Sequence, residues 1–274
     1  MKNKVFDLID RVAIITGGAG LFGEKHAEAI AEAGGTPILV DINKALTEQK
    51  AKKISDRFGI PCLGWRADIT DKAQVQELLQ AVIQKFSRVD ILINNAANNP
   101  KQEASTKETW SRLENFTLDL WQQDLAVGLT GAFICSQVIG TEMARRGGGV
   151  ILNIASDLGI IAPDQRIYRK PGLPEEEQSV KPVSYSVVKH GLIGLTKYLA
   201  TYWADKGVRV NAISPGGIYN NQPADFVEKL TNLIPMSRMA DRDEYKGAII
   251  FLVSDASAYM TGSNLIIDGG RTCW

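Results

Sequence analysis

Short apolar runs alternate along the chain with longer segments in which apolar residues recur every three or four positions. Val75, Leu78 and Val82 show this longer spacing, which places them on one face of a helix. Helices are predicted over 22–33, 44–58, 71–86, 118–146, 185–205 and 241–253. The shorter runs, rich in Val, Ile and Leu, predict strands over 12–16, 37–41, 63–68, 89–94, 149–155, 208–214 and 264–268.

This alternation favours an α/β fold in which a doubly wound parallel sheet carries helices on both faces. A run as apolar as 89–94 supports that arrangement, because such a strand is covered on both sides. At 274 residues, with no linker and no repeat, the chain fits one domain over 1–274. Two polar segments, 98–117 and 157–184, depart from the pattern, and the second contains four prolines, so it is a candidate functional loop.

Composition removes several classes of function. Lys+Arg and Asp+Glu number 31 each, so no excess of positive charge points to a nucleic acid. The N-terminal residues include acids and no long apolar run, so we expect no secretory signal. We also expect no membrane span, because no uninterrupted apolar stretch is long enough to cross a bilayer. Three widely spaced cysteines suggest a reducing cytoplasm without a disulfide framework. Because the chain has two histidines, His26 and His190, few residues are available for a histidine-rich metal site or a Ser-His-Asp triad. We expect His26 on a helix surface.

A glycine-rich turn follows the first predicted strand. Residues 18–23 read G-x-G-x-x-G and open the first predicted helix. Glycines let the main chain approach a pyrophosphate, and a helix N-terminus supplies free N–H groups with positive potential. An ordinary small strand-to-helix loop is the alternative. The dinucleotide interpretation assigns cofactor contacts to Gly17, Gly20, Leu21, Phe22 and Gly23.

Asp41 ends the second predicted strand, where a dinucleotide-binding domain places an acid. Its carboxylate would accept hydrogen bonds from the adenosine ribose hydroxyls and repel a 2′-phosphate. This favours NAD as the cofactor. The alternative role for Asp41 is the N-cap of the next helix.

Tyr185 and Lys189 are four residues apart at the start of a predicted helix, so they share one face. Oxidation of an alcohol needs a base for the hydroxyl proton, and a tyrosine becomes one when nearby positive charge favours its phenolate. The pair alone is weak evidence, because helix surfaces produce this spacing by chance.

The chain contains an ordered series of motifs: "TGGAGLFG" (16–23), Asp68 in "ADIT", "NNAA" (94–97), Ser156 in "LNIAS", Tyr185 with Lys189, "SPGGI" (214–218) and "TGSNLIIDGG" (261–270). In this order, over nearly the whole length, the chain resembles the single-domain members of the short-chain dehydrogenase/reductase family. The long 157–184 segment gives it a weaker likeness to surface-sugar and flagellin-modification dehydrogenases.

The resemblance implies a Rossmann-type fold and a role for each matching residue. Ser156 would orient and polarise the substrate oxygen, Tyr185 would be the acid/base, and Lys189 would hold the nicotinamide ribose and assist Tyr185. Further cofactor contacts would come from Asp68, Ile69, Asn95 and Ile218. The apolar C-terminal segment around 265–267 resembles an edge that forms tetramers, so we expect a homotetramer or dimer.

Three positions depart from the family pattern. Leu21 and Ala97 each replace a usual glycine, and Gly128 replaces an asparagine that completes a proton relay. If that asparagine acts through its main-chain carbonyl at a helix kink, glycine can substitute for it. If its side chain acts, turnover should be slow.

The expected substrate is polyhydroxylated, because the loops around the predicted pocket are polar. Their polar residues are Asn98, Asn99, Gln165, Arg166, Tyr168, Asn220, Asn221 and Gln222. Among these, Arg166, Tyr168 and Asn220 are the candidate substrate contacts. The alternatives are a gluconate-type sugar-acid dehydrogenase and a catalytically weakened dinucleotide-binding subunit.

Three cations lie close together in the 157–184 segment. Arg166, Arg169 and Lys170 have no acid between them and would suit a phosphate or carboxylate on the substrate. The alternative is that they face solvent, or pair with the acids of 175–177 or with a neighbouring subunit.

Overall fold

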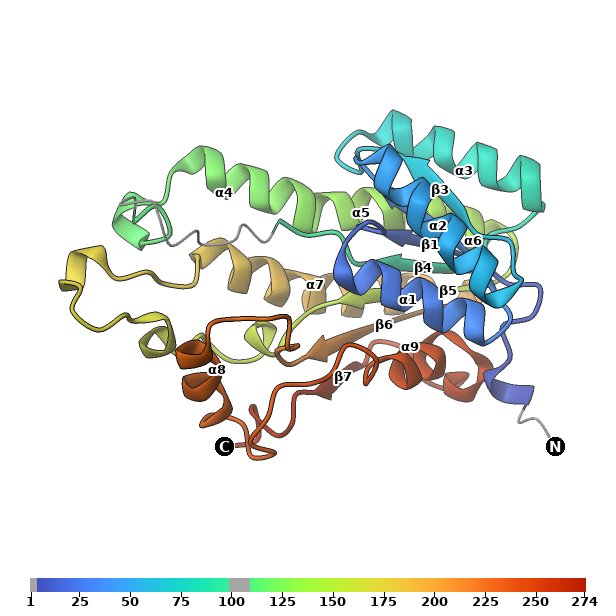
Figure 1. The fold of residues 1–274 in the computed structure, drawn as a ribbon. Coiled ribbons are helices and arrows are strands. Elements are labelled where there is room, and N and C mark those ends of the chain that lie inside the picture. Colours follow the sequence, from blue (N-terminus) through green and yellow to red (C-terminus); the bar gives the residue numbers. More distant parts are fainter. Residues whose placement is uncertain (1–3, 99–108) are drawn as a thin grey trace.

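The computed structural model describes residues 4–98 and 109–274, and within them seven parallel strands form one sheet (Figure 1). Their order is β3-β2-β1-β4-β5-β6-β7. The strands are β1 (Val12–Thr16), β2 (Thr36–Asp41), β3 (Leu63–Arg66), β4 (Ile91–Asn94), β5 (Gly149–Ile154), β6 (Val208–Pro215) and β7 (Asn264–Ile267). The chain runs outward from β1 to β3 and then returns to β4 beside β1. The order therefore reverses between β1 and β4, and a ligand crevice belongs at the carboxyl ends of these two strands.

Helices cover both faces of the sheet, as the alternation predicted. The larger helices are α1 (Leu21–Glu32), α2 (Lys44–Phe58), α3 (Lys72–Phe86), α7 (Val183–Tyr202) and α9 (Lys246–Val253). Side chains of β1 alternate between two apolar clusters, with Ile15 in the cluster under α1 and α9 and Ile14 in the cluster under α3 and α7. This alternation explains why every residue of β1 is buried.

The predicted helix over 118–146 is interrupted. It consists of α4 (Leu118–Leu125), α5 (Gly131–Cys135) and α6 (Thr141–Arg145), joined by π-helical turns at Ala126–Thr130 and Ser136–Gly140. Contrary to our expectation, the run Leu118–Arg145 is long and apolar enough to cross a membrane by length and composition. Its second half contributes Cys135, Ile139 and Met143 to the core beneath the sheet, which is the behaviour of a core helix.

The structure also corrects two smaller expectations. His26 is 2% exposed rather than on a helix surface, because its ring lies 5.7 Å from that of Phe22 on the covered side of α1. The helix α8 (Ala224–Thr231) was not predicted, since its eight residues are too few to show a clear period. The predicted helix over 241–253 begins at Lys246, because the Glu244 side chain holds the preceding turn through Asp241 N.

The 157–184 insertion is folded rather than a plain loop. It contains short 3-10 turns at Asp157–Gly159, Gln165–Tyr168 and Glu175–Glu177. Ile167 anchors it in a small apolar cluster with residues of α8 and the loop after it. In Figure 1 the insertion, α4 and α8 all extend beyond the carboxyl edge of the sheet. Of the polar segment 98–117, residues 99–108 lie outside the described part of the chain.

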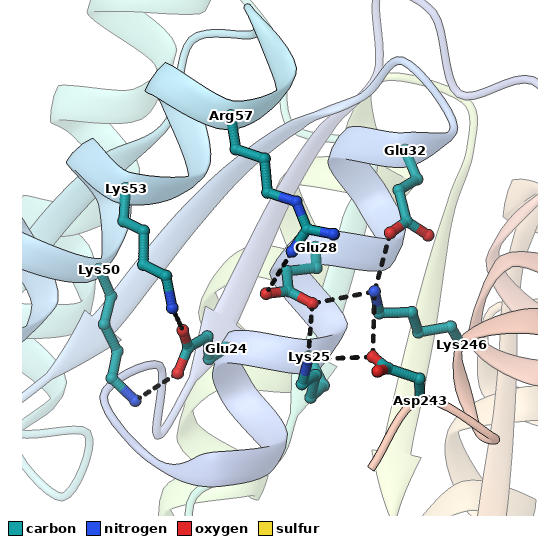
Figure 2. Close-up of polar contacts among 9 residues, drawn as sticks. All are labelled: Glu24, Lys25, Glu28, Glu32, Lys50, Lys53, Arg57, Asp243 and Lys246. Atoms are coloured by element: carbon teal, nitrogen blue, oxygen red, sulfur yellow. Dashed lines mark hydrogen bonds and ion pairs between the residues drawn. The ribbon is translucent and has the colours of Figure 1, made fainter. Parts of the chain in front are cut away.

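A network of charges joins α1 to its neighbours (Figure 2). The Glu28 carboxylate, almost fully buried, pairs with Lys25 at 2.9 Å, with Lys246 at 2.9 Å and with Arg57 at 3.3 Å. Burial alone would raise the pKa of Glu28, but hydrogen bonds from Lys246 and Lys25 lower it. The network therefore ties α1 to α2 and to the start of α9, on the side of the sheet where the glycine turn lies.

Candidate active site

Packing inside the protein explains most of the glycines between β1 and α1. Gly17 has φ +64°, and a Cβ on Gly23 would lie 2.3 Å from the Gly17 carbonyl oxygen. A Cβ on Gly18 would lie 2.7 Å from a side chain of β2. Gly20 differs, because a Cβ there would meet only one atom, at 3.2 Å. Because Gly20 is less crowded than its neighbours and lies next to the first N–H groups of α1, the turn favours approach of a ligand over the small-loop alternative.

The residue that follows β4 supports the glycine turn through hydrogen bonds. Asn95 Nδ2 donates hydrogen bonds to the main-chain oxygens of Thr16, at 2.9 Å, and Gly17, at 3.2 Å. Burial lowers the pKa of His26 to about 4, against an opposing hydrogen bond with Asn95, so His26 is neutral at physiological pH. Asn95 thus shapes the turn from inside the protein.

Asp41, at the end of β2, faces the glycine turn. Its Oδ2 accepts a hydrogen bond from Ala19 N at 3.2 Å, and its Oδ1 accepts one from Asn43 N at 3.1 Å. The N-cap role belongs to Asn43, whose side chain accepts from Leu46 N at the start of α2. Asp41 is therefore not the N-cap of α2, and its carboxylate faces the glycine turn.

The remaining predicted cofactor residues lie at the same edge of the sheet. Asp68, after β3, accepts hydrogen bonds from the main chain and hydroxyl of Thr70. Ile69 is buried beside α5, and Ile218 is buried after β6. Leu21 and Phe22 form the first turn of α1. The predicted cofactor residues thus lie at or just after the carboxyl ends of strands, in the first turn of α1, or on α7.

The predicted catalytic residues meet at this edge too. Ser156 follows β5, whereas Tyr185 and Lys189 lie on α7. The Ser156 hydroxyl lies near enough to the Tyr185 phenol to lower the pKa of the phenol. Lys189 is 5% exposed, and its Nζ donates to the Ile154 carbonyl at 2.7 Å. The structure therefore brings together a hydroxyl, a phenol and an ammonium group from two elements.

Burial dominates the electrostatics of these groups. It raises the pKa of Tyr185, while the nearby Ser156 hydroxyl acts in the opposite direction. It lowers the pKa of Lys189 to about 8, with the charge of Lys181 adding to the effect. A neutral phenol is thus the resting form of Tyr185, and its ionisation depends on nearby positive charge.

Three residues that the sequence did not single out lie beside this group. Asp157 Oδ1 accepts a hydrogen bond from Ser156 Oγ at 2.7 Å, and Asp157 Oδ2 accepts one from Arg271 Nη1 at 2.6 Å. Asp157 and Arg271 are both buried. Lys181 Nζ lies 3.8 Å from the centre of the Tyr185 ring. Asp157 could have been suspected from its place after Ser156, but Arg271 is 114 positions away and gives no local signal.

The candidate substrate contacts are less closely gathered. The Arg166 side chain is 79% exposed and pairs with Asp164. Tyr168 is partly buried, with its ring 5.5 Å from that of Phe226 on α8. The Asn220 side chain accepts a hydrogen bond from Arg242.

The contacts of the cations in the insertion agree with the alternative in which they form ion pairs or face solvent. Arg169 pairs with Glu175 at 3.0 Å, and Lys170 is exposed. Of the polar residues expected around the pocket, Asn98 Nδ2 donates to the Gln123 carbonyl of α4 at 3.3 Å, whereas Asn99 lies outside the described residues.

Gly128 lies in the π-helical turn Ala126–Thr130 and packs against α7. A Cβ at position 128 would lie 2.6 Å from Val188 Cγ1. Val188, directly before Lys189, thus fills the space that a larger residue at 128 would need.

A parallel sheet with a glycine turn at its switch point, together with this serine, tyrosine and lysine, defines a dinucleotide-binding oxidoreductase fold. The family model described as short chain dehydrogenase matches residues 11–168, and the one described as enoyl-(acyl carrier protein) reductase matches residues 175–272. The chain belongs to the short-chain dehydrogenase/reductase family, which uses a nicotinamide dinucleotide.

Similar proteins act on polyols and sugar acids. A D-threitol dehydrogenase of Mycolicibacterium smegmatis is 34% identical, over 97% of this chain and 95% of that protein. An NAD-dependent glycerol dehydrogenase of Listeria innocua is 32% identical, over 98% and 97%. The structure of a gluconate 5-dehydrogenase from Burkholderia cenocepacia, in complex with NADP and tartrate, matches with TM-score 0.85 and 28% identity over 98% of each chain. The likeness supports a polyol- or sugar-type oxidoreductase.

Proposed function

We propose that this protein is an NAD-preferring dehydrogenase that interconverts a secondary alcohol and a ketone on a polyol or a sugar-derived substrate. The observation that carries the proposal is the meeting of Ser156, Tyr185 and Lys189 at the sheet edge that also holds the glycine turn. Nicotinamide, when bound, accepts or donates the hydride. Gly20 and the N-terminus of α1 would hold its pyrophosphate, and Asp41 its adenosine ribose.

In the proposed mechanism Tyr185 takes the hydroxyl proton of the alcohol as the hydride leaves carbon. Ser156 holds the reacting oxygen. In this structure its own proton is directed to Asp157, at 2.7 Å; with the alcohol bound it would turn to donate to the reacting oxygen, which leaves the single proton of the alcohol for Tyr185. Lys189, fixed by the Ile154 carbonyl, supplies positive charge that favours the phenolate.

The preference for NAD rests on Asp41. Its carboxylate, held by the amides of Ala19 and Asn43, would meet a 2′-phosphate with like charge. Ile42 and Asn43 follow it, so no basic residue comes directly after Asp41 to receive such a phosphate.

The polyol class rests on the relatives and on the polar surroundings of the catalytic group. The polar and charged side chains near the catalytic group are those of Asp157, Arg271, Tyr168 and Lys181. Such surroundings suit a hydroxylated substrate better than an acyl chain. Arg166, Tyr168 and Asn220 stay proposed contacts. A gluconate-type activity is the second candidate, supported by the similar gluconate 5-dehydrogenase structure.

A substrate panel tests the proposal. Purified protein is assayed with NAD and with NADP against threitol, glycerol, mannitol, gluconate, sugar phosphates and nucleotide sugars. The proposal expects NADH formation with a neutral polyol or free sugar derivative. Faster turnover of gluconate favours the second candidate. Tight NAD binding without turnover of any substrate favours a weakened dinucleotide-binding subunit and contradicts the proposal.

We also propose a homo-oligomer, a tetramer or dimer, in a reducing cytoplasm. Exposed apolar side chains support association, among them Phe133, Tyr198, Tyr259 and Ile266. All three cysteines are free thiols, which suits a reducing compartment. Light scattering after size-exclusion chromatography gives the mass, and a monomer would contradict the proposed association.

A further inference from the structure

A second ammonium group lies on the ring of Tyr185. Lys181 Nζ is 3.8 Å from the ring centre, closer than Lys189 Nζ, which is 5.7 Å away. Lys181 belongs to the end of the 157–184 insertion and precedes α7, so its approach depends on how the insertion folds back onto the helix. Cations near an aromatic face are attracted to it, and the attraction grows when the site is shielded from water.

The charges around Lys181 come from several elements. Asp157, after β5, and Asp124, on α4, both face it and raise its pKa, but burial outweighs them and lowers the pKa of Lys181 to about 8. Lys189 faces it from α7. Asp157 is also paired with Arg271, and the Asp124 carboxylate accepts a hydrogen bond from Ser184.

We propose that Lys181 is a positioning residue for the proposed acid/base, and that its ammonium group on the ring face stabilises the Tyr185 phenolate. The inference rests on the proposed function, because it needs Tyr185 to ionise during turnover. A unit charge about 5 Å from the phenolate, in the intermediate dielectric of a protein cleft, is worth roughly a tenfold change in the fraction ionised. The insertion thus contributes to catalysis through its last residues.

The sign of the pH dependence follows from the charge on Lys181. Below about pH 8 the side chain is protonated and favours the phenolate. As the pH rises through that value the proton is lost, and the support for the phenolate fades. The contribution of Lys181 is therefore largest near neutral pH and disappears in alkaline solution.

The test compares Lys181→Met and Lys181→Gln, which remove the charge, with Lys181→Arg, which keeps it. Lys197→Met, which changes an exposed lysine on the helix that carries Tyr185, is the control. Two quantities are measured: kcat/KM from about pH 6 to about pH 10 with the polyol that gives the fastest NADH formation, and tyrosinate absorbance from about pH 8 to about pH 12. The absorbance difference between each protein and its Tyr185→Phe counterpart isolates the ionisation of Tyr185 and needs no substrate.

The inference expects both neutral variants to lose roughly tenfold in kcat/KM near pH 7 and to approach the original protein by about pH 10. Because Lys181 has already lost its proton where Tyr185 ionises, the neutral variants should leave that ionisation near the original. Lys181→Arg stays charged in alkali and should move it to lower pH by about one unit, and Lys197→Met should leave it unchanged. A loss of kcat/KM that is the same at every pH, or an unchanged Tyr185 ionisation in Lys181→Arg, would overturn the role of Lys181. Failure of the proposed function looks different, because turnover would then survive Tyr185→Phe.

Discussion

At the scale of single residues, some residues of the candidate site could be predicted from the sequence, whereas others are found only from the fold. Ser156, Tyr185 and Lys189 carry motif spacing, so their roles could be predicted. Lys181 and Arg271 could not, because each reaches the site through the path of a loop rather than through a regular period. His26 was placed on the wrong side of its helix for a related reason. One polar residue on a helix does not say which face is covered.

Asp41→Ala tests the basis of cofactor choice. The original protein should prefer NAD over NADP by tenfold or more in kcat/KM, since losing hydrogen bonds to a charged group costs about 1.5–3 kcal/mol. The variant should narrow that gap, because the like charge facing a 2′-phosphate is gone. Steady-state kinetics with both cofactors measure it. Equal kcat/KM values in the original protein would reject the assignment.

Arg271→Met tests the buried pair behind Ser156. Removal of the guanidinium leaves the Asp157 carboxylate buried without its partner, which should lower the free energy of unfolding by about 3–5 kcal/mol. Denaturant unfolding measures this change. The control is Arg238→Met, which breaks the more exposed pair with Glu244 and should cost no more than about 1 kcal/mol. Equal losses in the two variants would show that the buried pair stabilises the fold no more than the exposed pair does.

At the scale of elements, the run Leu118–Arg145 shows what periodicity misses. Its apolar spacing predicted helix correctly, but the π-helical turns arise where glycines let neighbouring side chains approach closely. Val188 approaches Gly128 in this way, and Trp203 approaches Gly140. Such fits depend on tertiary contacts, so the sequence alone does not show them.

Gly128→Asn tests the fit between that run and α7. The added side chain meets Val188 at once and should destabilise the protein by about 1–3 kcal/mol. Val188→Ala makes room, so the double variant should recover part of the loss in a double-mutant cycle of unfolding free energies. Additive effects would mean that the two positions do not compete for space. If the double variant is also faster in turnover, an asparagine side chain at 128 assists proton transfer.

At the scale of the whole molecule, the alternation of strands and helices predicted the doubly wound sheet and the edge at which its ligands gather. It predicted neither α8 nor the folded insertion, because both are short segments held mainly by contacts with each other. These are the parts that extend past the carboxyl edge of the sheet (Figure 1). The chemistry of the site could therefore be predicted more fully than its substrate, since the proposed substrate contacts lie mainly on segments whose structure depends most on tertiary packing.

The most direct test of the account is Tyr185→Phe, measured for cofactor binding and for turnover on the same preparation. The substitution removes one hydroxyl group and leaves the ring, the glycine turn and Asp41 in place. The account predicts an NAD dissociation constant within a few-fold of the original and a turnover number lower by roughly 10²–10⁴, the usual worth of general acid–base catalysis. Near-normal turnover in this variant, with cofactor binding intact, would contradict the assignment of Tyr185 as the acid/base.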